Sequence, residues 1–336
     1  MSKFSLDVLN KRVFPFVETN DPDVILGASF GEDVALTQVG GDILASHVDP
    51  IVGAIENIGW LAVHVACNDI ATSGIPPRWI LLLVLVPKQT DEDLLEHIMS
   101  DIKRGAEEVG VSIIGGHTGY SSGLRRPMVA VSAFGTASGR RPVYTNGACV
   151  GDQVLITKGV AMEGTAILAQ DFEDVATELG MNKQDLEEAR SLINEISVVK
   201  EALVLAKIGT SAMHDVTRGG LLETLLEIAH LSGVGIEVDT SRMLIRPIVT
   251  SFAQAFKFDP LKMISSGSLV ATVHPKRMTE ISRTLTKMGI PFANIGRVKK
   301  GKDVSLLLGD KVIRYHKIRC EEDELARMWT LYPRDK

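Results

Sequence analysis

The sequence predicts a mixed α/β (α+β) protein built from two domains. Its 336 residues are typical of about two domains, at roughly 100–200 residues each. Short apolar segments of strand length alternate with longer segments that have the period of amphipathic helices. Between residues 137 and 152 the composition shifts to glycine, proline and arginine. We therefore expect a boundary there, with an N-terminal domain over 1–148 and a C-terminal domain over 149–336.

The N-terminal half is predicted to alternate four strands with two helices. The expected strands are Ile43–Val48, Trp79–Val86, Val111–Ile114 and Met128–Thr136. One helix, Trp60–Ser73, is mostly apolar and ends at Gly74, ahead of two prolines. The other helix follows Thr90, its expected N-cap, and runs to about Val109. The spacing of its apolar residues predicts a buried face made of Leu94, Leu95, Ile98 and Ile102.

The C-terminal half continues the alternation. The expected strands are Gln153–Thr157, Gly235–Val238 and Ser268–Val273, and the expected helices are Gly164–Gln170, Lys183–Lys207 and Pro275–Met288. A turn over His214–Gly220 is expected to lead into a further helix that ends at Leu231. The last part of the chain has the pattern of a hairpin.

Charge and apolar content exclude two classes of partner. Lys+Arg number 36 and Asp+Glu 42, so the formal net charge is −6, whereas nonspecific nucleic-acid binding needs a basic surface. The short basic runs, Arg140–Arg141 and the lysines at 299, 300 and 302, lack interleaved aromatic residues. The longest apolar run, Trp79–Val86, is well short of the roughly 18 residues that cross a bilayer. We therefore expect neither nucleic acid nor a membrane as a partner.

Cysteine usage favours a cytoplasmic protein. The three cysteines, Cys67, Cys149 and Cys320, are widely scattered, which excludes a disulfide scaffold and a cysteine-based zinc module. The first ten residues have no apolar signal-peptide core.

Common catalytic motifs are absent from the sequence: the P-loop, the G-x-G-x-x-G fingerprint, the G-x-S-x-G elbow and H-E-x-x-H.

Four aspartates at the ends of apolar segments are the main candidates for chemistry. They are Asp33, Asp49, Asp69 and Asp215. A carboxylate in apolar surroundings is unfavourable unless it is paired or bound to a metal. If several converge, they form an oxygen-rich site that suits Mg²⁺ and phosphoryl transfer. Each also has a structural alternative: a turn for the first two, a backbone contact at a helix end for Asp69, and a helix N-cap for Asp215.

Two glycine pairs and four histidines add further candidates. Gly115-Gly116 after a strand allows close approach of a phosphate, which the hydroxyl of Thr118 could bind, although a strand-ending turn is the alternative. Gly219-Gly220 precedes a helix N-terminus, which favours anions, and the neighbouring Arg218 could bind a phosphate. Histidines that could form the site of a metal hydrolase are His47, His64, His117 and His214, of which His64 is better explained as a core residue.

Read together, these segments resemble the PurM-like ATP-binding superfamily, which includes aminoimidazole ribonucleotide (AIR) synthase, thiamine-monophosphate kinase, selenophosphate synthetase and the hydrogenase maturation factor HypE. The run Asn57–Arg78 resembles its signature helix. The other resembling segments, in the family's order, are Gly31-Glu32-Asp33-Val34-Ala35, Ser46-His47-Val48-Asp49, Gly115-Gly116-His117-Thr118, Asp152–Gly159 and Asp215-Val216-Thr217-Arg218-Gly219-Gly220-Leu221. Ile264–Leu269 matches a late element loosely, and HypE is the member most resembled.

The resemblance implies a two-domain fold whose N-terminal domains pair into a homodimer, with ATP and Mg²⁺ as cofactors. It places Asp33, Asp49 and Asp69 on the metal and the phosphates. It assigns nucleotide contacts to Asn68, Gly115, Gly116, His117, Thr118 and Gly219. Asp215 and Arg218 would act at the transferring phosphate or at the acceptor.

The implied activity is Mg-ATP-dependent phosphorylation of an oxygen of an acceptor, either a small molecule or a carboxamide. HypE ends in a reactive cysteine, whereas this sequence ends Tyr332-Pro333-Arg334-Asp335-Lys336, and Cys320 lies well upstream. Met162-Glu163-Gly164-Thr165 also differs from the D-H-G element of HypE. Two alternatives stay open: a noncatalytic nucleotide-binding scaffold or maturation partner, and the metal hydrolase.

Overall fold

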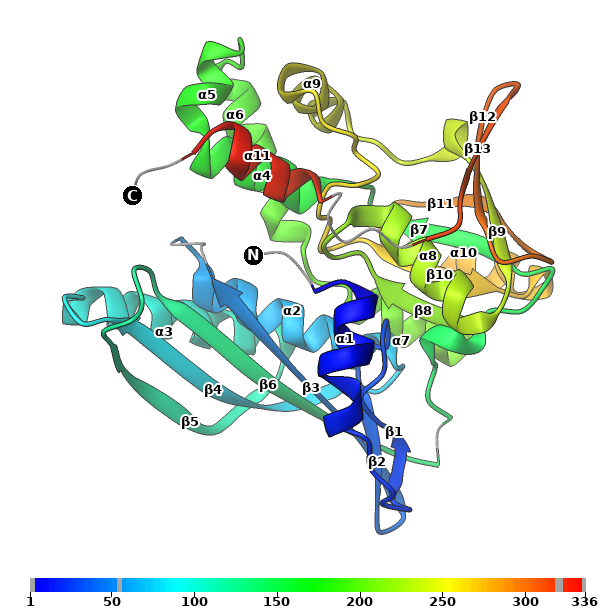
Figure 1. Ribbon diagram of the computed structural model, residues 1–336, viewed down its shortest axis with the longest axis horizontal. Coiled ribbons are helices and arrows are strands. Elements are labelled where there is room, and N and C mark those ends of the chain that lie inside the picture. Colours follow the sequence, from blue (N-terminus) through cyan, green and yellow to red (C-terminus); the bar gives the residue numbers. More distant parts are fainter. Residues whose placement is uncertain (1–3, 53–55, 140, 318–322, 334–336) are drawn as a thin grey trace. The chain divides into compact units, whose positions relative to one another are not determined.

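The computed structural model describes residues 4–52, 56–139, 141–317 and 323–333. It divides into two compact units, each described separately. The N-terminal unit comprises Glu18–Ala28 and Asp33–Pro142. The C-terminal unit comprises the rest of the described chain, including helix α1 (Leu6–Arg12). Each unit has its own β-sheet with helices (Figure 1), so the predicted α/β class is confirmed.

Six strands form the sheet of the N-terminal unit, in the order β1-β2-β3-β6-β4-β5. Their bounds are Val24–Leu26 (β1), Ala35–Val39 (β2), Asp42–Val52 (β3), Pro77–Pro87 (β4), Ser112–Ser121 (β5) and Met128–Ser138 (β6). Only the pair of β4 and β5 is parallel among the pairings described. The long strands β3 and β6 pair along their whole length, from Asp42 opposite Ser138 to Val52 opposite Met128.

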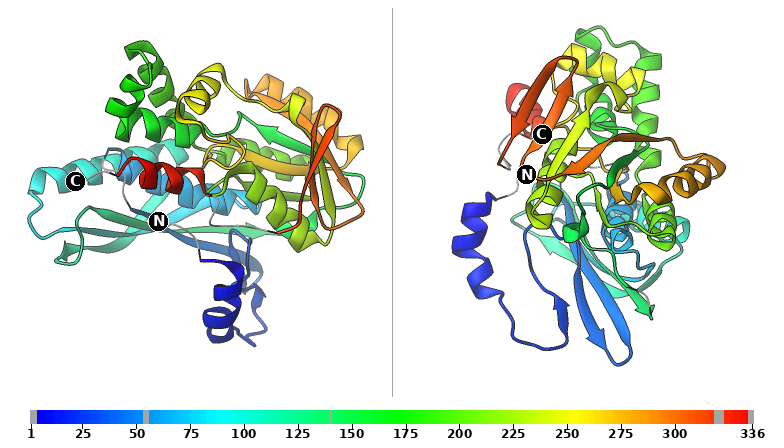
Figure 2. Two further views of the ribbon diagram at one scale, coloured as in Figure 1. Left: turned by 45° about the horizontal axis from the view of Figure 1, so that its top comes forward. Right: turned by 90° about the vertical axis from the view of Figure 1, so that its right-hand side faces the viewer.

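Helices α2 (Ile58–Thr72) and α3 (Glu92–Val109) cover one face of this sheet (Figures 1 and 2). All residues of α2 are buried, as its nearly uninterrupted apolar sequence predicts. Helix α3 is amphipathic, and its N-cap is Asp91, not the predicted Thr90, because the Asp91 carboxylate accepts a hydrogen bond from the Leu94 amide at 2.9 Å. Ile98 and Ile102 are buried as predicted, whereas Leu94 and Leu95 are only half-buried.

The other face of the sheet is apolar but less covered. In β6, residues that alternate with the buried Val129, Val131 and Ala133 are half-exposed. In β4 the same alternation leaves Leu81 37% exposed. Within this unit, a run of half-exposed apolar side chains therefore lies opposite the helices.

The segment Gly115–Thr118 belongs to β5 and is not the predicted loop. Strand β5 continues through it because it pairs with β4, with a bulge between Ile80 and Leu81. A Cβ on Gly116 would lie against the carbonyl oxygen of Leu82 and 2.8 Å from its nitrogen. Only glycine therefore allows β5 to approach β4 this closely.

The C-terminal unit has a seven-stranded sheet in the order β13-β12-β9-β11-β7-β10-β8. The strands are β7 (Gln153–Thr157), β8 (Ala212–Asp215), β9 (Gly235–Asp239), β10 (Leu269–Val273), β11 (Phe292–Lys299), β12 (Val304–Leu308) and β13 (Lys311–Tyr315). Strands β12 and β13 form the predicted hairpin at the end of the sheet. His214 and Asp215 belong to β8, so the predicted turn is shorter than expected and begins after Asp215.

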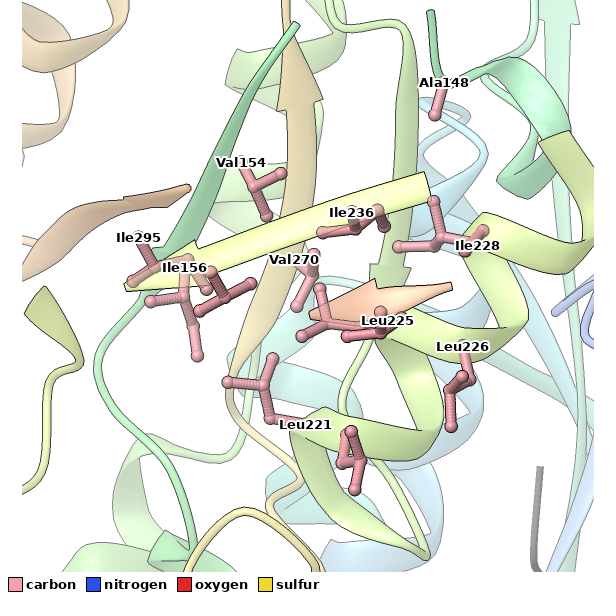
Figure 3. Close-up of a cluster of buried hydrophobic side chains, with 14 of the residues drawn as sticks. Ala148, Val154, Ile156, Leu221, Leu225, Leu226, Ile228, Ile236, Val270 and Ile295 are labelled. Atoms are coloured by element: carbon pink, nitrogen blue, oxygen red, sulfur yellow. The ribbon is translucent and has the colours of Figure 1, made fainter. Parts of the chain in front are cut away.

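Helix α8 (Gly220–Ser232) packs on this sheet, and the apolar side chains between the two form a hydrophobic core of the C-terminal unit (Figure 3). Leu221, Leu225 and Ile228 from α8 meet Ile236 and Val270 from the strands. All five side chains are 0% exposed. This contact fixes the N-terminus of α8 relative to the strand end that carries Asp215.

Several of the remaining helices enclose a second hydrophobic core, which is centred on three phenylalanines. The helices are α4 (Met162–Asp171), α5 (Glu173–Glu178), α6 (Lys183–Ser191), α7 (Val199–Ile208), α9 (Pro247–Phe256), α10 (Met278–Lys287) and α11 (Glu324–Leu331). Phe172, Phe252 and Phe256 lie at the centre of this second core, and the Phe172 ring lies 4.7 Å from that of Trp329 in α11. Helix α11 thereby anchors the last described part of the chain.

The single helix predicted over Lys183–Lys207 is broken into α6, a short 3₁₀ turn and α7. The ammonium group of Lys158 donates to the carbonyl oxygens of Glu195 and Ser197, at 2.9 and 2.5 Å. It also pairs with the carboxylate of Glu201 at 2.8 Å. These carbonyls point to Lys158 instead of continuing a helical ladder, which a local sequence pattern cannot predict.

No helix among the described residues is long and apolar enough to cross a membrane. Cys67 is buried and Cys149 is exposed, both as free thiols. Cys320 and Arg140 lie outside the described residues.

Candidate functional site

The N-terminal unit pairs two of the sequence candidates directly. His47 lies on β3 and Asp69 on α2, and the His47 Nε2 atom is 3.1 Å from Asp69 Oδ2. The pair forms because β3 residues 43, 45, 47, 49 and 51 share the face that α2 covers. The side chain of Asp69 is only 8% exposed, whereas that of His47 is 22% exposed. An almost buried carboxylate therefore stands beside a group that can carry a positive charge.

The negative charge of Asp69 shifts the pKa of a neighbouring side chain. Burial raises the pKa of the neighbouring Cys67 thiol to about 12, and the negative charge of Asp69 adds to this shift. Asp69 lies in the last turn of α2, where its backbone carbonyl accepts a hydrogen bond from the Thr72 hydroxyl at 2.7 Å, and its side chain faces β3. Asn68 beside it is fully buried. The side chain of Asp69, and not only its backbone, is thus placed for a specific partner.

Asp33 and Asp49 belong to the same unit. Asp49 and Pro50 lie within β3, so the turn alternative for Asp49 is wrong. Asp33 lies two residues before β2 and is half-buried, as is Asp49. The ligand oxygens of Asp33, Asp49 and Asp69, all described residues, do not all lie within 4.8 Å of one another. Their shared role at a metal stays a prediction.

The Gly-Gly-His-Thr segment lies away from these acids. In the sheet order, β5 is separated from β3 by β6 and β4. Three steps between neighbouring strands correspond to about 14 Å. His117 pairs with Leu83, on the face opposite the helices, and Thr118 points to the other face. Within one N-terminal unit, this segment and Asp49 therefore do not form one compact site.

The C-terminal unit places Asp215 at the end of β8. Its side chain is 0% exposed, and among the described residues neither carboxylate oxygen has a hydrogen-bond partner. The ring of His214 lies beside it, with Nδ1 3.7 Å from Asp215 Oδ1 and 2.7 Å from the Asp215 carbonyl oxygen. His214 Nε2 lies 3.3 Å from Glu227 of α8. The helix N-cap alternative for Asp215 is wrong, because Gly219 is the N-cap of α8.

Glu163, in the first turn of α4, is a buried acid that the sequence does not identify as a site residue. Burial raises the pKa of its carboxyl group, and hydrogen bonds from Ser266 and the positive charge of Arg218 oppose this shift. The Ser266 amide donates to Glu163 Oε2 at 3.1 Å. Asp215 raises the same pKa by its negative charge, so Glu163, Asp215 and Arg218 share one region.

The turn before α4 is strained. Lys158 and Ala161 are not glycines, yet their φ angles are +60° and +59°. Such strain persists only where surrounding contacts impose it, and it is concentrated at functional sites. The sequence signal that could have found Glu163 is a charged residue in an otherwise small and apolar stretch, Val160–Ala166.

Arg218 and Gly219 form the end of the turn that follows Asp215. Arg218 Nη1 lies 3.7 Å from Asp323, the N-cap of α11, and its side chain is 29% exposed. Gly219 has a φ of +79°, and a Cβ there would lie 2.6 Å from the carboxylate carbon of Glu223. Glycine at 219 thus lets the Glu223 side chain fold back over the N-terminus of α8.

Of the remaining predicted histidines, His64 has structural partners. His64 is 3% exposed, as expected for a core residue, and its Nε2 lies 3.2 Å from Glu108. Its ring also lies 4.2 Å from that of Trp60. In neither unit taken alone do three described His, Cys, Asp or Glu side chains bring ligand atoms within 4.8 Å of one another.

Taken within each unit, the arrangement offers two kinds of chemistry. The N-terminal unit offers carboxylate oxygens, the donors that Mg²⁺ prefers. The C-terminal unit offers a buried carboxylate with free acceptor capacity, Asp215, and an arginine three residues further along the chain, Arg218. The first suits proton removal and the second suits anion binding.

Comparison with known proteins identifies both halves. Residues 31–137 match the N-terminal domain of AIR synthase related proteins, and residues 150–309 match their C-terminal domain. A carbamoyl dehydratase HypE from Rhizobium leguminosarum bv. viciae is 28% identical over 263 residues, 75% of this chain and 71% of that protein. A thiamine-monophosphate kinase from Archaeoglobus fulgidus is 28% identical over 247 residues, 71% of this chain and 76% of that protein.

The solved structures agree on the fold. A hydrogenase maturation protein HypE in complex with ATP aligns with a TM-score of 0.71 at 23% identity, over 82% of this chain and 86% of that chain. Both halves of the chain match the domains of one family, and the relatives and the solved structure agree with that match. The chain therefore belongs to the AIR synthase related family of the PurM-like superfamily, close to HypE.

Proposed function

We propose that the protein is a Mg-ATP-dependent phosphotransferase or synthetase that transfers the γ-phosphoryl group of ATP to an oxygen of an acceptor. The observation that carries this proposal is the match of both halves to one family, combined with the buried acids Asp69 and Asp215. Two relatives support it by name, one a carbamoyl dehydratase and one a kinase. The HypE structure with ATP supports the choice of nucleotide.

In this proposal, Asp33, Asp49 and Asp69 hold Mg²⁺ and the phosphates. Their donor set fits, because all three offer carboxylate oxygens and Asp69 is nearly buried beside His47. Bound Mg²⁺ would neutralise phosphate charge and orient the triphosphate. His47 positions the Asp69 carboxylate, and Asn68 and Gly219 contact the nucleotide.

Asp215 and Arg218 act at the acceptor. The carboxylate of Asp215 accepts the proton that the acceptor hydroxyl or amide loses as its oxygen is phosphorylated. Both of its oxygens have free capacity for that hydrogen bond. Arg218 orients the transferring phosphate, and its ion pair with Asp323 holds the guanidinium group in place.

We further propose that the protein acts as a homodimer through its N-terminal units. The sheet face opposite α2 and α3 carries half-exposed apolar side chains, among them Leu81 and Val48, which is 61% exposed. Strand β5 is an exposed edge. A second copy would cover this face, and its Gly115–Thr118 segment could meet the acids of the first copy, although the two are about 14 Å apart within one copy.

The test is calorimetry of Mg-ATP binding to the wild type and to Asp69→Asn. We expect the dissociation constant to rise at least tenfold, because one charged ligand is lost while the side chain keeps its size. Asp42→Asn is the matched control: Asp42 is an exposed carboxylate at the start of the same strand as His47. Equal affinities of Asp69→Asn and wild type would overturn the metal role of Asp69.

The buried acids disfavour the second candidate function, a noncatalytic nucleotide-binding scaffold. A scaffold has no need of a buried acceptor carboxylate such as Asp215. Release of ADP in a screen of candidate acceptors separates the two functions. Tight Mg-ATP binding without turnover on any acceptor would support the scaffold.

A further inference from the structure

We propose that the oxygen atoms around the Lys158 ammonium group form a monovalent-cation site, suited to an ion such as K⁺ or NH₄⁺, which the chain fills with its own side chain. Three oxygens make up the site. The carbonyl oxygens of Glu195 and Ser197 lie 2.9 and 2.5 Å from Lys158 Nζ, and a carboxylate oxygen of Glu201 lies 2.8 Å from it. All four residues belong to the C-terminal unit, and none has a role in the proposed phosphoryl transfer.

This cation site is buried. The side chains of Lys158 and Glu201 are only 8% and 3% exposed. An ammonium group has three N–H donors and no acceptor, so three oxygens match its capacity. Without a cation, a buried carboxylate and two carbonyl oxygens would face one another with no positive charge between them, which is strongly unfavourable. The three oxygens therefore need a cation, whatever its source.

The positions of the oxygens are set by the backbone and by packing. Glu195 ends the short 3₁₀ turn Leu192–Glu195, and Glu201 lies in the first turn of α7. The Glu195 carbonyl oxygen is tightly packed, because a Cβ on Gly267 would lie 2.7 Å from it. The Glu195 carboxylate is held separately by two hydrogen bonds from Arg246, at 2.7 and 2.5 Å. Backbone carbonyls fixed in this way can replace the hydration shell of an ion such as K⁺, whereas Li⁺ is too small to contact all three oxygens.

The ammonium group of Lys158 also holds a turn beside the candidate site. Lys158 has a φ of +60°, and such strain persists only where surrounding contacts impose it. The carbonyl of the next residue, Gly159, accepts a hydrogen bond from the Ser268 hydroxyl. The Ser268 carbonyl in turn accepts one from the Val216 amide at 2.8 Å, directly after Asp215. The tethered cation thus fixes the turn that leads into α4 and supports the strand end that carries Asp215.

The test replaces the tethered cation in the full-length protein. Lys158→Gly removes the ammonium group and also relieves the backbone strain, because glycine accepts a positive φ. Lys257→Gly is the matched control: Lys257 is exposed and has a φ of +55°, so the same charge and a similar strain are removed elsewhere in the same unit. A double variant, Lys158→Gly/Glu201→Gln, removes the charged oxygen ligand as well.

Two measurements report on the site. Circular dichroism gives the midpoint of thermal unfolding (Tm) in the chlorides of K⁺, NH₄⁺, Li⁺ and choline, all at one ionic strength so that general screening is the same. Equilibrium dialysis with radioactive Rb⁺, which substitutes for K⁺, counts the ions bound per chain. Neither measurement needs a nucleotide or an acceptor, so the result does not depend on the proposed phosphoryl transfer.

We expect K⁺ and NH₄⁺ to raise the Tm of Lys158→Gly by about 5 °C or more over choline, as for a ligand well above its dissociation constant. Li⁺ should have no such effect. Because the site of the wild type is already filled, its Tm and that of Lys257→Gly should differ little between the four salts. Lys158→Gly should bind one more Rb⁺ than either protein, and the double variant should lose both effects.

Equal salt responses of Lys158→Gly and Lys257→Gly would mean that the ions act on the protein as a whole, and would overturn the inference. A Lys158→Gly protein whose Tm or Rb⁺ binding does not depend on the lost lysine would do the same. Persistence of both effects in the double variant would place the ion elsewhere. Failure of Lys158→Gly to fold even in potassium chloride would also contradict the proposed site, since free K⁺ should then have replaced the ammonium group.

Discussion

Neighbouring glycines in β5 offer a controlled test of whether the Gly-Gly segment is structural or ligand-binding. Gly115 and Gly116 have nearly the same φ, +154° and +152°, so alanine at either position would have to adopt nearly the same unfavourable φ. Their surroundings differ. A Cβ at 116 meets the backbone of Leu82, whereas a Cβ at 115 meets only the flexible tip of the Leu81 side chain at 3.3 Å.

The difference between the two variants isolates the steric clash. Ordinary contacts of a Cβ lie at 3.4–4 Å, but at position 116 the Leu82 nitrogen and carbonyl carbon would be 2.8 and 2.9 Å away. The β4 backbone is paired with β6 on its other side, so relief of the clash requires the edge strand β5 to move away and weaken its pairing with β4. Overpacking of this kind costs about 1–3 kcal/mol. We therefore expect Gly116→Ala to be less stable than Gly115→Ala by about 1–3 kcal/mol.

Guanidinium chloride unfolding followed by tryptophan fluorescence measures this difference, because Trp60 and Trp79 both lie in the N-terminal unit. Calorimetry with Mg-ATP then reports on Gly115→Ala, which keeps the sheet intact. A large loss of affinity there supports a phosphate contact. If Gly115→Ala proves as unstable as Gly116→Ala, the structural account of this strand is refuted.

Three further predictions concern the buried groups. Asp215→Asn should reduce turnover at least 100-fold with unchanged Mg-ATP affinity, and equal losses in both would contradict its acceptor role. Because burial raises the pKa of Glu163, the folded chain retains a proton that the unfolded chain releases, so the free energy of unfolding should fall as pH rises above 4.5. Denaturant titrations should show a weaker fall in Glu163→Gln. Mass mapping after thiol labelling at pH 8 should find Cys149 modified and Cys67, whose pKa is about 12, unmodified.

The local pattern predicts most elements of the fold because they bury continuous apolar faces. The strand Gln153–Thr157 and the helix around Trp60 are found at nearly their observed bounds. Failures occur where a distant residue decides the local structure. Lys158 interrupts the helix predicted over Lys183–Lys207, and pairing with β4 extends β5 through the glycines. The local pattern does not predict strands β1, β2 and β11 or helices α1, α5, α9 and α11.

The site residues, too, are predictable from the local sequence, whereas their partners depend on distant parts of the chain. Asp69 and Asp215 stand out in the sequence because they interrupt apolar runs, and both are buried. The partnership of Asp69 with His47 depends on packing of α2 on β3, and that of His214 with Glu227 on packing of α8. Neither is visible from spacing. The sequence does not identify Glu163 as a site residue, because a single glutamate near the start of a helix usually faces solvent.

Cytoplasmic localisation and the boundary after residue 148 stay predictions from composition. The role of each predicted ligand also depends on whether a nucleotide and Mg²⁺ bind together. The most direct test is therefore calorimetry of ATP binding to the wild-type chain, with Mg²⁺ and with a chelator. We predict tight binding that weakens at least tenfold when Mg²⁺ is removed. No ATP binding under either condition, or equal affinity under both, would contradict the proposal that carboxylates and a divalent ion hold the triphosphate.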